Sequence, residues 1–128
     1  MKFLISNLLL IAIMSKPSCG KPKSTATGCY KGRLEVKALC MNYTIKVLEG
    51  GIDKSLIADQ WKDESTGKTY SNVFALKSRC NFPATLKEGD EFYFTIDNTS
   101  NQDCAVCMAY YPVPAKGLSI KVLPGGCQ

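Results

Sequence analysis

The cysteines constrain the fold of this chain more than any other feature of its sequence. The chain contains seven, and six remain if residues 1–20 are removed as a leader. Six cysteines in a short chain bound for an oxidising compartment indicate a framework of up to three disulfides. Such crosslinks add to a folding free energy that is usually about 5–15 kcal/mol. The pairing stays open among Cys29, Cys40, Cys80, Cys104, Cys107 and Cys127.

Residues 1–20 have the layout of a secretory signal peptide. A basic tip precedes an apolar run that is too short to span a bilayer, and small residues follow it. We expect cleavage after Gly20, which discards Cys19, whereas the alternatives, cleavage after Ser15 or Ser18, would leave an odd thiol. No later apolar stretch approaches the roughly 20 residues of a membrane span. The sequence therefore predicts a secreted protein with no membrane anchor.

The remainder is expected to comprise a flexible arm at residues 21–28 and a single domain at residues 29–128. The arm is polar and rich in small residues. The net charge of +5 includes two lysines of the leader, so the predicted mature chain carries +3. This mild charge gives no support to nucleic-acid binding.

The charges are unevenly distributed, since residues 88–115 contain acidic side chains but no base. A basic stretch earlier in the chain could bind a glycosaminoglycan-like polyanion or an acidic extracellular protein. The alternative is the ordinary solvated face of a β-protein. The basic candidates for a binding surface are Lys31, Arg33, Lys37 and Lys46.

Apolar and polar residues alternate along most of the domain, which is the pattern of half-buried β-strands. Residues 34–36 and 43–47 alternate with opposite parity, so they form either two strands or one long strand with a β-bulge. Residues 53–60 are the one candidate for a short helix. Five or six strands joined by turns predict an all-β fold, either a small disulfide-braced OB-like barrel or a sandwich. The other expected elements are an apolar segment at 56–61, a hairpin loop at 63–68, a turn at 86–90 and strands at 70–76, 92–96, 105–111 and 118–122.

The chain contains no histidine, and this absence limits its chemistry. Ser-His-Asp and Cys-His catalytic arrangements are excluded, and the commonest metal ligand is missing. Two pairs of adjacent carboxylates, Asp63 with Glu64 and Asp90 with Glu91, are expected in exposed turns, where neighbouring side chains point apart. We therefore predict a protein that is not an enzyme and that carries no cofactor or metal ion.

Cys104 and Cys107 form a C-x-x-C motif, which in other settings indicates redox or zinc chemistry. Here the motif lies in a predicted strand, and the chain has no second ligand pair. We expect each of the two cysteines to bond a different distant partner. Cys127 is expected to pin the C-terminal tail to the body of the domain.

Two N-glycosylation sequons begin at Asn42 and Asn98. Asn98 lies in a predicted polar loop and should be accessible. Asn42 lies inside a predicted strand, so we expect it to be less accessible to glycosylation than Asn98.

Tyr110 and Tyr111 precede two prolines at the end of a predicted strand. Such a stiff, partly apolar segment could be a contact surface. The alternative is a pair of packed tyrosines followed by a proline-stiffened turn. Trp61 is expected in the core.

Two blocks of the sequence resemble the netrin-like modules. Residues 40–47 are similar to their opening strand, in which a cysteine precedes a Tyr-x-Ile/Val-x-Val segment. Cys80 with residues 86–94 is similar to their Cys-x-x-x-Leu-x-x-Gly-x-x-Tyr-Leu block. These modules occur in netrins, complement components, procollagen C-proteinase enhancers and tissue inhibitors of metalloproteinases. Over residues 29–127 the resemblance implies a disulfide-braced, five-stranded OB-like barrel that binds other proteins outside the cell.

The chain departs from these modules in one respect that bears on activity. Metalloproteinase inhibition in the family depends on an N-terminal Cys-x-Cys, and the sequence contains none. The resemblance therefore carries over the fold and the binding role but not that mechanism.

The sequence thus predicts a secreted, non-catalytic binding protein that recognises an extracellular protein or polyanion through its barrel surface. One alternative is a protease inhibitor acting through an exposed loop, for which Lys116, followed by Gly117, is the candidate. The other is a basic host-defence or toxin-like effector, which the absence of a cationic amphipathic helix opposes.

Overall fold

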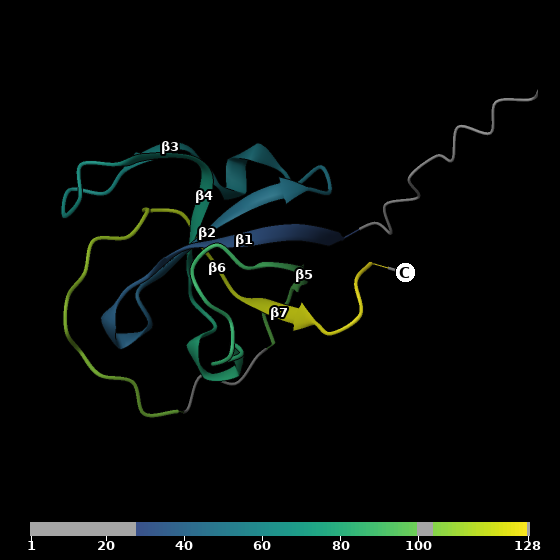
Figure 1. Cartoon of the computed structure of the whole chain (residues 1–128). Coiled ribbons are helices and arrows are strands. Elements are labelled where there is room, and N and C mark those ends of the chain that lie inside the picture. The colour runs from purple at the N-terminus through teal and green to yellow at the C-terminus, as the bar shows by residue number, and fades with distance from the viewer. Residues whose placement is uncertain (1–27, 100–103, 128) are drawn as a thin grey trace, which may run out of the picture.

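The computed structural model of the chain describes residues 28–99 and 104–127 (Figure 1). The predicted signal peptide and, except for Gly28, the predicted arm lie outside the described residues.

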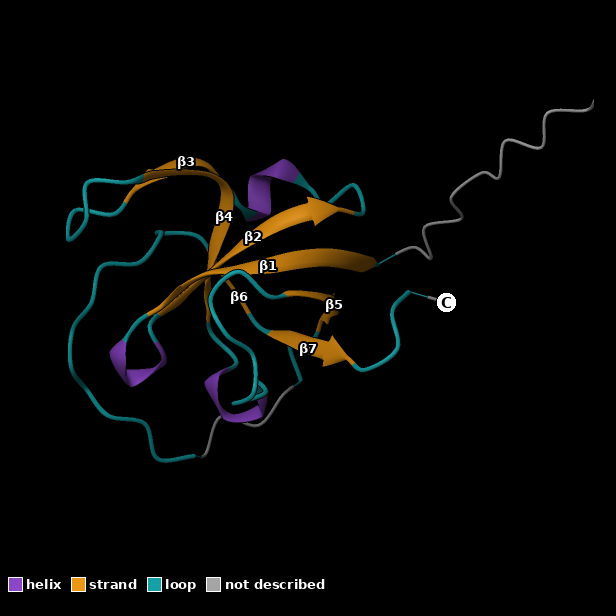
Figure 2. Cartoon of the chain, viewed as in Figure 1, coloured by secondary structure: helices purple, strands orange, loops and turns teal. Residues whose placement is uncertain are grey.

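The described residues form an all-β domain, as the alternation of the sequence predicts (Figure 2). Three one-turn 3₁₀ helices, η1 (Leu39–Met41), η2 (Lys54–Leu56) and η3 (Arg79–Asn81), interrupt the strands. The strands are β1 (Cys29–Lys37), β2 (Tyr43–Glu49), β3 (Ala58–Lys62), β4 (Thr69–Leu76), β5 (Glu91–Ile96), β6 (Gly117–Leu118) and β7 (Ile120–Leu123).

The strands belong to one strongly curved sheet in the order β3-β4-β2-β1-β5-β7, and β6 pairs in parallel with β4. Only Ser119 separates β6 from β7, and β7 pairs with β5. The last segment of the chain therefore pairs with two strands, β4 and β5, that lie toward opposite ends of the strand order. The ladder breaks at Ser119, where the buried Ser78 hydroxyl donates to the Ile120 carbonyl at 2.9 Å and accepts from the Ile120 N–H at 2.7 Å. The sheet is therefore barrel-like without being fully closed, as is usual for small OB-like barrels.

Alternate residues of the strands meet in a core of aliphatic and aromatic side chains. Leu34, Ile45, Phe74 and Phe94 are fully buried there. The rings of Phe74 and Phe94 are 5.7 Å apart, and a line of ring contacts continues from Phe94 through neighbouring aromatics. Gly32 is required in β1, because a Cβ at this position would lie 2.9 Å from the Phe94 ring.

Trp61 is not part of this core, contrary to the sequence prediction. It is half-buried on β3, and its ring stacks on Tyr70 of β4 at 5.8 Å. β3 is an edge strand, and its register with β4 places Trp61 directly opposite Tyr70.

Residues 34–36 and 43–47, whose apolar positions alternate with opposite parity, belong to two separate strands, because η1 lies between β1 and β2. Within η1, Cys40 and Met41 have φ angles of 58° and 56°, in the left-handed region that non-glycine residues rarely adopt. This turn reverses the chain and carries one disulfide.

Two expected elements are wrong. The helix predicted over residues 53–60 is only η2, because the Asp53 carboxylate accepts from the Ser55 N–H at 2.9 Å, and β3 follows at once. The strand predicted over residues 105–111 does not form, because its two cysteines are drawn to different partners and no strand lies alongside. The last predicted strand is present but is split into β6 and β7.

Candidate binding site on a disulfide-held strap

Three disulfides join the six cysteines of residues 29–127. They are Cys29–Cys127, Cys40–Cys107 and Cys80–Cys104, with Cα–Cα distances of 5.7, 5.0 and 5.4 Å. The prediction that the two cysteines of the C-x-x-C motif bond different distant partners is confirmed. Cys127 pins the C-terminal tail to the start of β1, also as predicted.

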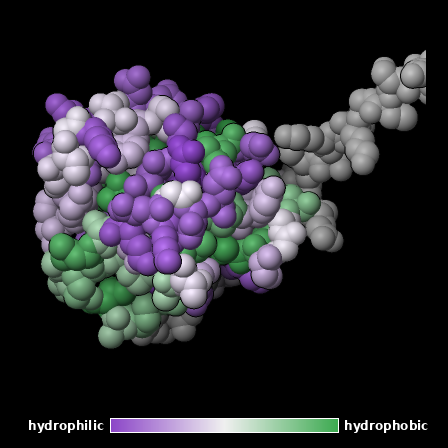
Figure 3. Space-filling view, viewed as in Figure 1, coloured by the Kyte–Doolittle hydropathy of each residue, from purple (hydrophilic) through white to green (hydrophobic). Residues whose placement is uncertain are grey.

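Two of these disulfides hold a segment without regular secondary structure, residues 104–111, which we call the strap. It runs as an open arc beside the sheet (Figure 1). The side chains of Met108 and Tyr110 are 93% and 87% exposed, and the nearby Leu39 of η1 is 57% exposed. Figure 3 shows hydrophobic residues gathered at the lower left of the molecule, where Figure 1 places η1 and the strap. Large apolar side chains exposed together are uncommon on a protein surface and mark contact sites.

The strap is fixed to the turn at η1 by a covalent bond and by one buried side chain. Cys107 is bonded to Cys40. Asn42, only 7% exposed, donates through Nδ2 to the Leu39 and Ala109 carbonyls, each at 3.0 Å. Its Oδ1 accepts from Arg79 Nη2 at 3.0 Å, which sets the orientation of the amide. The turn therefore holds the strap at two points that are two residues apart.

A second anchor lies at the other end of the strap, on the β3–β4 hairpin. The Tyr111 hydroxyl donates to Asp63 Oδ2 at 2.9 Å, and the Ser65 N–H donates to Asp63 Oδ1 at 2.8 Å. Asp63 is fully buried, so the expectation of an exposed carboxylate here is wrong. The strap covers this end of the hairpin, which removes the carboxylate from water.

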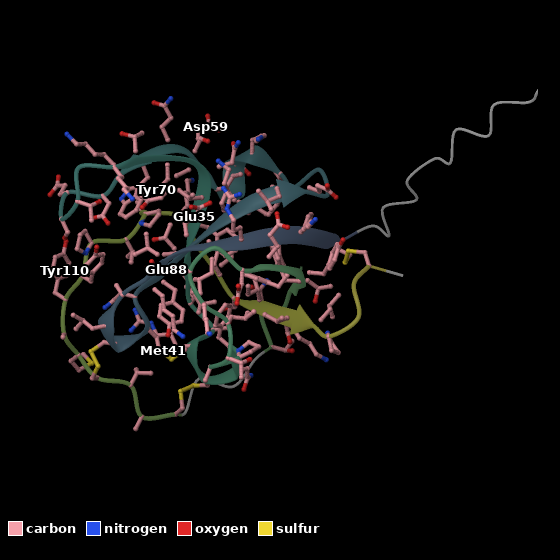
Figure 4. All side chains as sticks on the ribbon, viewed as in Figure 1. Glu35, Met41, Asp59, Tyr70, Glu88 and Tyr110 are labelled. Atoms are coloured by element: carbon pink, nitrogen blue, oxygen red, sulfur yellow. A yellow bond between two sulfur atoms is a disulfide. The ribbon has the colours of Figure 1, made fainter. Side chains whose placement is uncertain are left out.

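The hydrogen bond to Asp63 raises the pKa of Tyr111 above its ordinary value, because ionisation would remove the donor and place two negative charges together. Burial raises the pKa of Tyr70, and the Asp63 carboxylate contributes further. Figure 4 shows Tyr70, Glu35 and Glu88 on the sheet side of the strap, whereas Tyr110 lies on the strap itself. Polar side chains of the sheet and of the turn before β5 therefore lie on the sheet side of the strap, whereas the exposed outer side chains of the strap, Met108 and Tyr110, are apolar or aromatic.

A pocket of about 470 Å³ lies between η1 and the strap. The Cys40–Cys107 disulfide forms part of its wall, and residues 37–41, Tyr43 and residues 105–107 line it. Leu39 lines the pocket, and Met108 directly follows the lining residue Cys107, so the pocket adjoins the exposed apolar residues of the candidate site.

The predicted basic surface is largely committed to contacts within the protein. Lys31 lies 3.6 Å from Glu91, and Arg33 forms a 2.7 Å ion pair with Glu35. Such partners weaken the attraction of a basic patch for a polyanion.

The other predicted basic residues are also engaged. Lys46 donates to the Ser71 hydroxyl at 2.9 Å, and Lys37 Nζ donates to the Leu86 carbonyl at 2.8 Å. Lys46 lies directly across from Arg33 in the β1–β2 pair, whereas Lys37 lies at the far end of β1. The structure therefore groups only part of the predicted basic stretch.

Lys116 is an unsuitable centre for an inhibitory loop. Its side chain is exposed, but its carbonyl accepts from the Ala75 N–H at 2.8 Å, and Gly117 pairs with the same residue of β4. The bond between Lys116 and Gly117 is thereby held in the sheet. An enzyme cleft cannot surround a backbone that is already paired.

The two sequons lie in different settings. Asn98 is exposed, in a turn after β5. Asn42 is buried, and its Nδ2 makes the two hydrogen bonds described above. A glycan on that atom would replace at least one of them, so we expect Asn98 to be the glycosylated residue.

Sequence reasoning identified Tyr110 and Tyr111 but missed Met108, the anchoring role of Asp63 and the clamping role of Asn42. Asp63 carries a signal, since an aspartate two residues before a serine is typical of a turn in which the carboxylate bonds the backbone. Its second partner, Tyr111, is 48 residues away and leaves no local pattern.

Within residues 28–99 and 104–127, no helix is long and apolar enough to cross a membrane, and no group of His, Cys, Asp and Glu residues could hold a metal ion. The three disulfides are consistent with an extracellular protein. Comparison of the chain with protein families, with curated proteins and with solved structures finds no match.

Proposed function

We propose that this chain is a secreted, non-catalytic protein that recognises another extracellular protein through the strap. The observation that carries the proposal is the exposure of Met108 and Tyr110 on a segment held by two disulfides. Methionine and aromatic residues are enriched in the centres of protein interfaces. They are costly to expose to water, so their presence on a fixed segment favours a binding role.

Rigidity of the segment strengthens this proposal. Binding normally requires ordering of loops and side chains, which reduces affinity. The disulfides, Asn42 and Tyr111 already hold the strap in place, so less order has to be gained on binding.

A protein partner is favoured over a polyanion. Lys31, Arg33 and Lys46 each have an acidic or hydroxyl partner, and the outer side of the strap is apolar. On a heparin column we expect elution at or below about 0.15 M salt, because each residue of the predicted basic stretch already has a partner within the protein.

Membership of the netrin-like family is part of the proposal. It is supported by the strand order, in which β1, β2 and β4 are consecutive neighbours, β5 lies beside β1, and the last segment contacts both β4 and β5.

Site-specific photocrosslinking tests the binding role. A photoreactive residue replaces the exposed Ala105 on the strap or, as the matched control, Asp59, which Figure 4 places on β3 away from the strap. The probe is the disulfide-intact protein in extracellular fluid of the source tissue. We expect one defined protein adduct from position 105 and none from position 59. Equal labelling from both positions, or no adduct, would contradict recognition through the strap.

A further inference from the structure

We propose that the strap occupies the active-site cleft of a serine endopeptidase whose primary specificity pocket is apolar, and that Met108 enters this pocket. This inference rests on the proposed function and assigns the class of the partner.

The backbone of the strap is available for such binding. Endopeptidases hold their substrates as extended segments through hydrogen bonds to the backbone, in the manner of an added β-strand. Among the described residues, the backbone of residues 105–110 makes a single hydrogen bond, at the Ala109 carbonyl. The remaining N–H and C=O groups of this segment are free to pair with an enzyme.

The peptide bond between Met108 and Ala109 is held from both sides by the same turn. On one side, Cys107 is bonded covalently to Cys40. On the other, the Ala109 carbonyl accepts from Asn42, which is two residues from Cys40. Met108 is thus presented between two fixed points, while its own side chain makes almost no contact with the protein.

These two attachments distinguish an inhibitor from a substrate. Hydrolysis would add one water molecule across the Met108–Ala109 bond and create a carboxylate and an amine. Both new ends would stay in place, because the disulfide holds Cys107 while Asn42 and the Tyr111–Asp63 bond hold the other side. Slow separation of the ends favours resynthesis and a long-lived complex, which accords with the tight binding of preorganised protease inhibitors.

The side chain at the presented position sets the class of enzyme. Methionine is unbranched, apolar and flexible, and it fits the hydrophobic slot of a chymotrypsin-like enzyme. A trypsin-like pocket contains an aspartate at its base and requires a basic residue.

The test measures inhibition of chymotrypsin and trypsin by the secreted, disulfide-intact protein with peptide substrates. We expect an inhibition constant for chymotrypsin below about 1 μM, or about 8 kcal/mol of binding free energy, and no inhibition of trypsin. Met108→Lys should weaken chymotrypsin inhibition about 100-fold or more and create trypsin inhibition. Leu56→Lys is the matched control, because it adds the same charge to an exposed apolar residue of η2, outside the strap and the pocket; it should leave both constants unchanged.

Three results would overturn the inference. They are an uninhibited chymotrypsin at about 10 μM protein, equal inhibition by wild type and Met108→Lys, and rapid cleavage after Met108 with full recovery of enzyme activity. A strap-specific photocrosslink together with any of these results would leave the proposed binding function standing and remove only the protease assignment. Absence of both the photocrosslink and chymotrypsin inhibition would remove the binding function together with the protease assignment.

Discussion

Replacing Asn42 with alanine tests whether one buried amide holds the strap to the turn at η1. The change removes three hydrogen bonds, two donated by Nδ2 and one accepted by Oδ1 from Arg79, each 3.0 Å long. Leu39 and Ala109 are exposed, so water can replace the amide at their carbonyls, and each loss costs about 0.5–1 kcal/mol. The charge-assisted bond to Arg79 is partly buried and contributes about 1.5 kcal/mol. The expected decrease in the free energy of unfolding is therefore about 2.5–3.5 kcal/mol.

Urea unfolding with the disulfides intact measures this decrease, with the fluorescence of the single tryptophan as the signal. With a slope of about 1–1.5 kcal/mol per molar urea, the midpoint should fall by roughly 2–3 M. The matched control is Asn81→Ala, which truncates an exposed asparagine and should change stability by less than about 0.5 kcal/mol. Production in a bacterial periplasm keeps both variants free of glycans.

The isosteric variant Asn42→Asp separates the clamp from the packing of the side chain. It retains an oxygen for Arg79 but turns a second oxygen toward the Leu39 and Ala109 carbonyls, which it cannot bond. We expect chymotrypsin to cleave the strap after Met108 faster in both Asn42 variants than in Asn81→Ala. The clamp would be refuted if Asn42→Ala matched Asn81→Ala in both unfolding midpoint and cleavage rate.

Three further predictions follow from other contacts. The raised pKa of Tyr111 means that its bond to Asp63 stabilises the fold fully below about pH 10 and is lost as the pH rises through the raised value. The unfolding midpoints of wild type and Tyr111→Phe should therefore differ at about pH 8 and converge only as the pH passes the raised pKa, and a constant difference would argue against this contact. Thr44→Val should raise stability by about 1 kcal/mol, because the buried Thr44 hydroxyl has no partner in the described part of the chain; a loss of stability in thermal unfolding would contradict it. The intact mass of the protein from a eukaryotic secretory host should correspond to a chain that starts at Lys21, with three disulfides and no free thiol before reduction. It should also show one glycan, which Asn98→Gln removes. A start before Cys19 would refute the predicted leader.

The sequence predicts the sheet well because each strand has one face in the core. Phe92 and Phe94 alternate with polar residues, and such alternation is a direct consequence of burial on one side. The turns around them contain glycine and charged residues that interrupt this pattern. Local chemistry is sufficient for these elements.

The strap could not be predicted in the same way. Its position depends on cysteines whose partners are distant and on Tyr111, whose partner Asp63 precedes it by 48 residues. β-branched and aromatic residues in this segment suggest a strand, but no neighbouring strand is present to pair with it. The side chains that resemble a strand locally are instead exposed, because tertiary attachments fix the backbone.

The division of the last strand at Ser119 has a consequence for the order of folding. The pairs β1–β2 and β3–β4 join strands that are consecutive in sequence, so they can form as soon as those strands are synthesised. The segment containing β6 and β7 pairs with β4 and β5 over long sequence separations, and such contacts form slowly because a large loop must close first. Until this segment is in place, Phe94 is paired with β1 but lacks β7 on its other side. The nascent chain therefore exposes aromatic core residues during synthesis, and its dependence on chaperones should end only when the last segment has left the ribosome.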